Sequence, residues 1–505
     1  MLPDDVLLTI FDFYRMDEER GVNHYGRSSL SLWFSQWILW KWRILVHVCH
    51  RWRQIVFASP RRLDLQIPCT LSTPLMRNLA IWPVFPIVVV YDIRSNEAPI
   101  GEDNIIAALM LPDRVCEVEF LLFGPRLREM AAVMQEPFPV LRRLDISLTY
   151  IHPPALLPTG FLGGSAPCLQ EISLCYVPYP ALPTLLLSTS DLVKLVVLDI
   201  PSDGYISPEA IAASLAALPR LETFSIGFEE DTPRPDWIPP PPVTRTVLPA
   251  LTSFTFLGFS EYLEDLVGRI DSPRLNHISI SYIYQPLGFR VTQLSKFIDR
   301  SVGPKITRCR HAEVRFFPRG SVAFDFCHGA NDSDLDRHLA TANIVYDGVH
   351  WHVTPISQVL SQFPVTLDKV VHLELKRGYK EDQTPVPEIE WSHLLRQFYN
   401  MQMLLVHQEF SEHVALSLED IADEMATEVL PSLKLICLEG EHIPSLDKFV
   451  AARLHSNFPV IVVNTIQEFK EKRESYSANE STSSASCVFY RLVFFNSTLL
   501  ILCRI

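Results

Sequence analysis

The sequence predicts an α/β chain in which an N-terminal helical module precedes a solenoid of parallel strands, with helices or loops on its convex side. Three observations predict this class: a helix signal at the start, an aromatic segment typical of further helices, and a strand motif that recurs about every 27 residues. The 505 residues exceed what one core usually needs, and 39 prolines against 18 glycines indicate many short elements. The predicted parts are residues 1–65 (helical module), 66–465 (solenoid) and 466–505 (a disordered or poorly packed tail).

The first predicted element is a short helix over residues 2–14. Pro3 suits the first helical turn, and Asp4 and Asp5 suit the positive end of the helix dipole. Five apolar residues follow at roughly helical spacing, which predicts that they share one face: Leu2, Val6, Leu7, Ile10 and Phe11.

The second element is an aromatic and apolar segment, residues 33–57, which holds five of the nine tryptophans. Its length suits a membrane span, but charged side chains are costly at bilayer depth, and the segment carries Lys41, Arg43, His47, His50, Arg51 and Arg53. We therefore expect a helix or helix pair with one face against a partner, and no membrane association. Cys49 is interpreted as a packed rather than a reactive side chain.

A motif of the form L-x-x-L-x-L then recurs beyond about residue 85. Its seven units are Val115/Val118/Phe120, Leu141/Leu144/Ile146, Leu169/Ile172/Leu174, Leu195/Leu198/Ile200, Leu221/Phe224/Ile226, Leu251/Phe254/Phe256 and Leu275/Ile278/Ile280. Each x-L-x-L core is typical of a short strand with alternate side chains pointing inward. One unit cannot bury that face alone, so stacked units are expected to share a core. The alternative is an α/β domain with recurrent strands but no solenoid.

Helices are expected to fill several of the intervals. Ser207 is a predicted N-cap with Pro208 as the first helical residue, and Ser260 begins another helix. Residues 229–246 contain four consecutive prolines and are expected to form an extended loop. Four looser units follow residue 283: His311/Val314/Phe316, Val370/Leu373/Leu375, Met401/Leu404/Val406 and Leu433/Ile436/Leu438.

Composition excludes several classes of function. The net charge of −14 is the opposite of what phosphate binding favours, so we expect no nucleic-acid partner. Ten cysteines without a C-x-x-C pair indicate neither a zinc site nor a disulfide framework and suit the cytoplasm or nucleus, and the start of the chain lacks the pattern of a signal peptide. No nucleotide-binding or hydrolase motif occurs, so we predict a non-enzyme without catalytic residues or cofactor.

Two groups of residues have metal-like spacing but lack a complete ligand set. Asp332, Asp334 and Asp336 are spaced as in a calcium loop whose turn glycine and final glutamate are missing. His350 and His352 have no third ligand at motif spacing, so no metal site is predicted. A basic cluster is interpreted as a solvated helix face rather than a phosphate site: Arg51, Arg53, Arg61 and Arg62.

The stretches LPDDVLLTIF and LVHVCHRWRQIVF resemble the F-box, whose pattern opens L-P-x-E/D-x-L-x-x-I-F and closes V-C-R-x-W-R. With the repeats, the chain resembles F-box proteins with irregular leucine-rich repeats, an arrangement common in fungi. The resemblance implies a three-helix unit that docks on the Skp adaptor of cullin–RING ubiquitin ligases. The residues implied in adaptor binding are Leu2, Pro3, Leu7, Ile10, Phe11, Val48, Cys49, Trp52 and Arg53.

The predicted function is therefore that of a non-catalytic substrate receptor, whose repeats hold an unknown target protein near a ubiquitin-transferring enzyme. The chain departs from the family pattern in its tryptophan-rich insertion between the two motif halves and in lacking the asparagine of regular repeats. The alternative is a leucine-rich-repeat scaffold or binding protein outside the ubiquitin pathway, in which the N-terminal helices only cap the repeats.

Overall fold

The structure is a computed structural model of the chain. It describes residues 2–16, 42–59, 62–63, 65–72, 78–79, 85–94, 101–150, 154–229, 244–285, 289–301, 310–317, 321–327, 338–346, 360–362, 367–378, 391–441 and 443–473. The chain forms two compact units, the first made of Met1–Val370 and Gly378–Ile389, the second of Val371–Arg377 and Glu390–Ile505. The three-part division given above stays a prediction.

The first unit contains N-terminal helices followed by alternating strands and helices. Its helices are α1 (Asp4–Met16), α3 (Trp42–Val48), α4 (His50–Ala58), α6 (Glu102–Leu109), α7 (Gly124–Val133), α8 (Leu182–Leu186), α9 (Pro208–Leu215), α10 (Ser260–Arg269) and α11 (Thr292–Ser301), with short 3-10 turns η3 (Phe161–Gly164) and η4 (Ser202–Gly204). Its strands are β1 (Ile67–Cys69), β2 (Ile87–Asp92), β3 (Val115–Leu122), β4 (Arg143–Leu148), β5 (Glu171–Cys175), β6 (Lys194–Ile200), β7 (Thr223–Phe228), β8 (Thr246–Val247), β9 (Ser253–Gly258), β10 (Ile270–Asp271), β11 (His277–Gln285), β12 (His311–Phe317), β13 (Ser321–Cys327) and β14 (His338–Tyr346).

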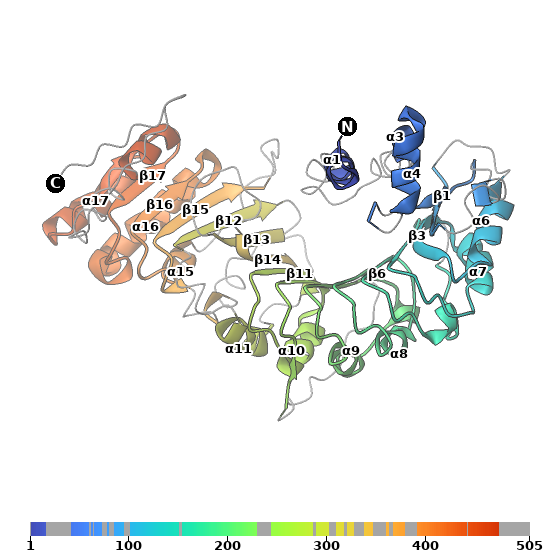
Figure 1. Cartoon of the computed structure of the whole chain (residues 1–505). Helices are drawn as coiled ribbons and strands as arrows, with labels where there is room; N and C mark the ends of the chain where they lie inside the picture. The colour runs from blue at the N-terminus through green and yellow to red at the C-terminus, as the bar shows by residue number, and fades with distance from the viewer. Residues whose placement is uncertain are drawn as a thin grey trace. The chain divides into compact units, whose positions relative to one another are not determined.

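Most strands of this unit form one sheet in nearly sequential order. The order is β1, β2, β3, β4, β5, β6, β7, β9, β11, β14, β13 and β12, while β8 pairs with β10 separately. Neighbours are parallel from β1 through β11 to β14. Helices α8 to α11 lie along one face of this sheet (Figure 1). The predicted α/β class with parallel strands is confirmed.

The middle positions of the repeated motif meet in register across the sheet. Leu144 pairs with Ile172, and Phe254 pairs with both Phe224 and Ile278. Along β4, buried and half-buried residues alternate, so every second side chain enters the core that the helices cover. The core of the unit is therefore built by stacking equivalent apolar positions.

The predicted register is wrong in β6. Leu195, proposed as the first member of its unit, pairs with Ile172 and Phe224, which are middle members. The equivalent unit is therefore Leu192/Leu195/Val197, and all three side chains are buried. The register shifts between Val197 and Ile200, and this irregularity places a second apolar series in the same strand.

The looser unit His311/Val314/Phe316 forms a strand, but not a parallel one. Strand β12 runs antiparallel to β13, and β13 runs antiparallel to β14. Only residues 318–320 separate β12 from β13, which is too short for the crossover that parallel strands need. The prediction of a further parallel unit is therefore wrong for β12.

The predicted helix starts agree with the structure. The Ser207 hydroxyl accepts a hydrogen bond from the backbone N–H of Ala210 at 3.2 Å, and Pro208 is the first residue of α9. Helix α10 begins at Ser260.

Most of the predicted proline-rich loop lies outside the described residues. Within the described part of the chain, no helix has both the length and the apolar composition that crossing a lipid bilayer requires.

An aromatic group anchors α10 to the sheet. The Tyr262 ring lies 4.4 Å from that of Phe228 and 6.0 Å from that of Phe256, measured between centroids. Its hydroxyl donates to the carbonyl oxygen of Ile206 at 2.9 Å. Tyr282 is also fully buried, but its hydroxyl has no hydrogen-bond partner among the described residues.

Tyr262 and Tyr282 give a matched test of two buried hydroxyl groups, one with a hydrogen-bond partner and one without a partner among the described residues. Tyr262→Phe is expected to lower the free energy of unfolding by about 1–3 kcal/mol, because the Ile206 carbonyl loses its donor while buried. Tyr282→Phe is expected to leave stability unchanged or raise it, since an unpaired buried hydroxyl is removed. Thermal unfolding of both variants measures the difference, and an equal loss in the two would contradict the prediction.

The second unit has a parallel sheet of its own. Strands β15 (His372–Arg377), β16 (Met403–Val406), β17 (Leu435–Leu438) and β18 (Ile461–Val463) pair in sequence order. Leu373, Leu404 and Ile436 meet in register, which confirms the last three looser units as parallel strands. The helices are α15 (Trp391–Leu395), α16 (Gln408–Val429) and α17 (Ser445–His455).

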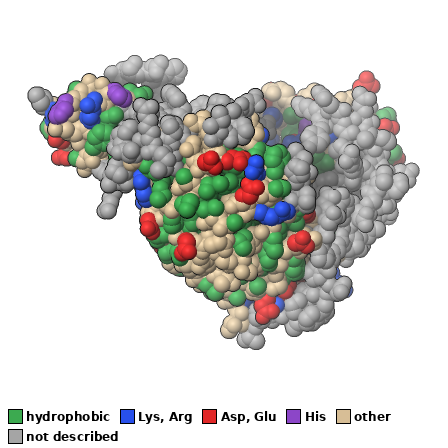
Figure 2. All heavy atoms as spheres, turned by 90° about the vertical axis from the view of Figure 1, so that its right-hand side faces the viewer, with side chains coloured by type: hydrophobic (Ala, Val, Ile, Leu, Met, Phe, Trp, Pro, Cys, Tyr) green, Lys and Arg blue, Asp and Glu red, His purple; other side chains and the backbone are tan. Residues whose placement is uncertain are grey.

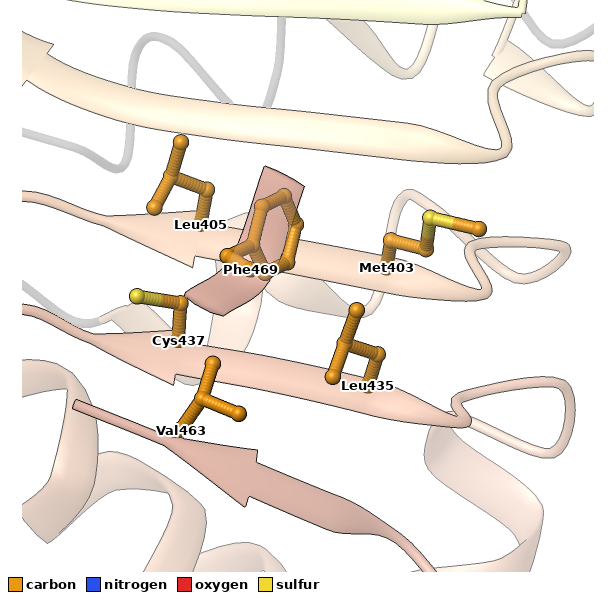
Figure 3. Close-up of a cluster of buried hydrophobic side chains, with 6 residues drawn as sticks. All are labelled: Met403, Leu405, Leu435, Cys437, Val463 and Phe469. Carbon is orange, nitrogen blue, oxygen red and sulfur yellow. The ribbon is translucent and has the colours of Figure 1, made fainter. Parts of the chain in front are cut away.

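A further helix, residues 466–473, covers part of this second sheet. Its Phe469 is fully buried against side chains from three strands: Met403, Leu405, Leu435, Cys437 and Val463 (Figure 3). The sequence prediction placed these residues at the start of a disordered or poorly packed tail. Most of these residues are charged, but Phe469 among them anchors the helix to the sheet. Residues 474–505 lie outside the described residues.

Candidate functional site

Helix α1 presents apolar side chains on two different faces. Leu7, Leu8 and Phe11 are buried, Phe11 with only 1% of its surface exposed. The other face carries the exposed apolar stripe, which we define as Leu2, Val6, Ile10 and Phe13. The stripe residues are between 41% and 62% exposed, which is unusual for four apolar side chains in one row.

The prediction that the apolar residues of this helix share one face is therefore wrong. Successive helical residues are rotated by about 100°. Val6 and Leu7 consequently point in different directions, as do Ile10 and Phe11. The motif thus combines two sets of residues, one that packs inward and one that faces outward.

The inward face of α1 packs against α4. The rings of Phe11 and Trp52 meet edge to face with centroids 4.8 Å apart. Helix α4 contributes Ile55 and Val56 as buried side chains. The two halves of the sequence motif, separated by the tryptophan-rich insertion, are thus brought into contact.

Two carboxylates of α1 also form ion pairs with arginines from later in the chain. The Arg51 guanidinium donates to the Asp4 carboxylate, with 3.2 Å between Nε and Oδ1, and also to the carbonyl oxygen of Leu2. The Arg62 guanidinium donates to the Asp12 carboxylate at 2.9 Å. Because these side chains are partly exposed, each pair contributes little stability but fixes orientation. Three arginines of the predicted solvated basic cluster have partners within the protein, because Arg53 also donates a hydrogen bond to a backbone carbonyl; Arg61 lies outside the described residues.

Helices α3 and α4 are separated by Cys49 alone, and α3 carries further exposed apolar side chains. Ile44 and Val48 of α3 are more than half exposed, whereas Leu45 and Val46 are buried. Cys49 lies between the helices, and its sulfur accepts a hydrogen bond from the backbone N–H of Trp52 at 3.4 Å. Cys49 is exposed and caps α4, so its interpretation as a packed side chain is wrong.

The nine residues implied in adaptor binding fall into three groups. Leu2, Pro3, Ile10, Val48, Cys49 and Arg53 lie on the surface, Leu7 and Phe11 are buried, and Trp52 is half-buried. Arg53 donates from Nε to the Val46 carbonyl oxygen at 3.0 Å, which ties the two helices together.

The predicted adaptor-binding set left out three exposed apolar residues: Val6, which had been placed on the helix face, and Phe13 and Ile44. Positions 2, 6, 10 and 13 are spaced by four, four and three residues, the spacing of one helical face. That spacing was a signal for Val6 and Phe13, although Phe13 lies beyond the family motif. The exposure of Ile44 follows from the packing of α3 and had no such signal.

The described surface offers little support for other classes of site. On the face viewed in Figure 2, Lys and Arg side chains stand among Asp, Glu and hydrophobic ones and form no broad basic patch among the coloured residues. Within each unit taken alone, no three described His, Cys, Asp or Glu side chains lie close enough to hold a metal ion. The aspartate series from Asp332 and the His350/His352 pair lie outside the described residues.

No family model matches the chain, and a search of curated proteins found no significant match. The candidate site therefore stands on the geometry of the N-terminal helices and on the motif residues that it contains.

Proposed function

We propose that this chain is an F-box substrate receptor of a cullin–RING ubiquitin ligase. Helices α1, α3 and α4 would bind the Skp adaptor, and an irregular leucine-rich-repeat solenoid would hold a target protein. The receptor performs no bond chemistry itself. It raises the effective concentration of the target near the enzyme that transfers ubiquitin.

The observation that carries the proposal is the exposed apolar stripe, which lies on the helix that begins the F-box-like motif. Protein interfaces are built around a few aromatic and aliphatic anchors with a polar rim. The stripe supplies such anchors, and Ile44 and Val48 supply two more on the motif's second half. The contact of Phe11 with Trp52 further supports the proposal, because it joins the motif halves in one small helical unit.

The repeated strands support the second part of the proposal. Equivalent apolar positions pair from β3 to β11, and the connecting segments return the chain to the same sheet edge each time. Stacked repeats of this kind leave a long sheet surface and one row of loops for binding a partner.

The test is capture of a purified Skp adaptor by the full-length chain. Ile10→Asp and Phe13→Asp are each expected to weaken binding at least about tenfold, since a buried interface position would then hold an unpaired charge. Binding is measured by biolayer interferometry, and circular dichroism checks that each variant remains folded.

A matched control is Leu187→Asp, which places the same charge at a leucine of the first unit that is 63% exposed but far from the motif in sequence. This variant is expected to bind the adaptor as the wild type does. Absence of adaptor binding by the folded wild-type chain would rule out the receptor function and favour a repeat protein outside the ubiquitin pathway.

A further inference from the structure

A group of aromatic and acidic side chains lies where four neighbouring strands of the first unit end. Tyr150 follows β4, Tyr176 follows β5, Asp199 lies near the end of β6 and Glu229 follows β7. These strands are parallel neighbours, so their carboxyl ends lie on one edge of the sheet. Loops at such an edge are held by a rigid scaffold and commonly carry binding residues. We call these four residues the tyrosine–carboxylate cluster.

Direct contacts join three members of this cluster. The rings of Tyr150 and Tyr176 lie with their centroids 4.5 Å apart. The Tyr150 hydroxyl donates to Asp199 Oδ2 at 2.5 Å, and the Cys175 thiol donates to the same oxygen at 3.4 Å. Both donors are neutral, and no Lys or Arg in the described part of the chain pairs with Asp199. Among the described residues, no cation therefore balances its negative charge.

The backbone holds the cluster in an uncommon conformation. Tyr176 has a φ of 60° and Asp199 a φ of 51°, in the left-handed region that residues other than glycine rarely adopt. Tyr150 is nonetheless 62% exposed, and its ring rests against that of Tyr176. The Thr149 hydroxyl, one residue earlier, is buried without a hydrogen-bond partner among the described residues.

The electrostatic environment of the cluster favours positive charge. Burial first, and then Asp199, raises the pKa of Tyr150 above its usual range. Burial and Glu229 raise the pKa of Tyr176 as well. The pKa of the Cys175 thiol rises to about 12 through burial and then Asp199. Burial is the larger cause at all three groups, and the carboxylates add to it by disfavouring further negative charge nearby; the charge of a carboxylate also attracts a cation.

We propose that the tyrosine–carboxylate cluster binds a Lys or Arg side chain of the target protein. The cation would lie over the exposed face of the Tyr150 ring and beside the Asp199 carboxylate, which combines a cation–π contact with a charge-assisted hydrogen bond. This inference rests on the proposed function and extends it by naming a chemical feature of the target. The net charge of −14 acts in the same direction, because it draws basic segments toward the chain.

The test uses the full-length chain and labelled peptides of glycine and serine that carry either two arginines or two glutamates, with binding measured by fluorescence anisotropy. The wild-type chain is expected to bind the arginine peptide more tightly. Tyr150→Leu and Asp199→Asn are each expected to weaken that binding about fivefold. Tyr150→Phe keeps the ring and is expected to retain binding, which a merely structural role of the hydroxyl would not predict.

Asp203→Asn is the matched control, because it removes the same charge at an exposed position four residues later, in η4. An equal loss with Asp203→Asn, an equal loss with Tyr150→Phe and Tyr150→Leu, or no preference for the arginine peptide would each overturn the inference. Adaptor capture by the same variants is measured in parallel and should not change. A wild-type chain that captures the adaptor but does not prefer the arginine peptide would contradict this inference alone, whereas a wild-type chain that fails to bind the adaptor would contradict the proposed function.

Discussion

Replacing Phe469 by alanine is expected to lower the free energy of unfolding of the second unit by about 3–5 kcal/mol. The ring is fully buried on the face of the sheet that β16, β17 and β18 form (Figure 3). Its centroid also lies 5.3 Å from that of the His372 imidazole. Its removal leaves a cavity that the short helix 466–473 cannot fill. The same change uncovers apolar side chains on the sheet, including Leu405 and Leu435.

Hydrogen–deuterium exchange measures this effect locally, which matters because a chain with two units does not unfold in one step. The amides of β16, β17 and β18 are expected to exchange faster in Phe469→Ala, while those of β4 to β7 in the first unit keep their rates. Glu468→Ala changes an exposed neighbour in the same helix and is the control. Unchanged exchange in the second sheet would show that the helix contributes no stability there.

The helix of residues 466–473 was not predicted from the sequence, for a physical reason. Residues 466–486 are charged and then serine-rich, a composition that predicts disorder because little apolar surface is available for burial. The first eight of these residues nevertheless form a helix, because Phe469 packs against apolar side chains of strands β16 to β18. The helix is held by tertiary packing of the Phe469 ring against residues far away in the sequence, and no local sequence pattern reveals such a contact.

The strands could be predicted because their signal is periodic. An apolar residue at every second position, repeated at similar intervals, specifies both the inward face and the stacking of equivalent units. The register failed at β6, where the irregularity beside Asp199 creates a second apolar series. The strand direction was predicted wrongly at β12, where the short connection to β13 requires an antiparallel partner.

The candidate site was predictable in part of its residues but not in their roles. The motif identified Leu2, Ile10 and Phe11 together, because a sequence motif records which positions matter without recording which way they face. Burial separates them: Leu2 and Ile10 are exposed, and Phe11 is not. The ion pairs of α1 with Arg51 and Arg62 depend on contacts across a long insertion, which periodicity within one helix cannot reveal.

Phe11→Ala is expected to destabilise the packing of α1 on α4 by about 3–5 kcal/mol, since the ring is buried and meets Trp52 edge to face. Phe13→Ala offers a matched control, because it removes the same side chain from a position that is 62% exposed on the same helix. The control is expected to change stability by no more than about 0.5 kcal/mol. Amide exchange in α1 and α4 measures both.

These two phenylalanines separate the internal role of the motif from its surface role. Phe11→Ala should weaken adaptor binding only as far as it increases amide exchange, because the ring itself is out of reach of a partner. Phe13→Ala should weaken adaptor binding while exchange stays at the wild-type rate, because its ring belongs to the exposed apolar stripe. If both variants bound the adaptor with wild-type affinity, the stripe would not be the docking surface; if Phe13→Ala also accelerated exchange, the separation of α1 into an inward and an outward face would be wrong.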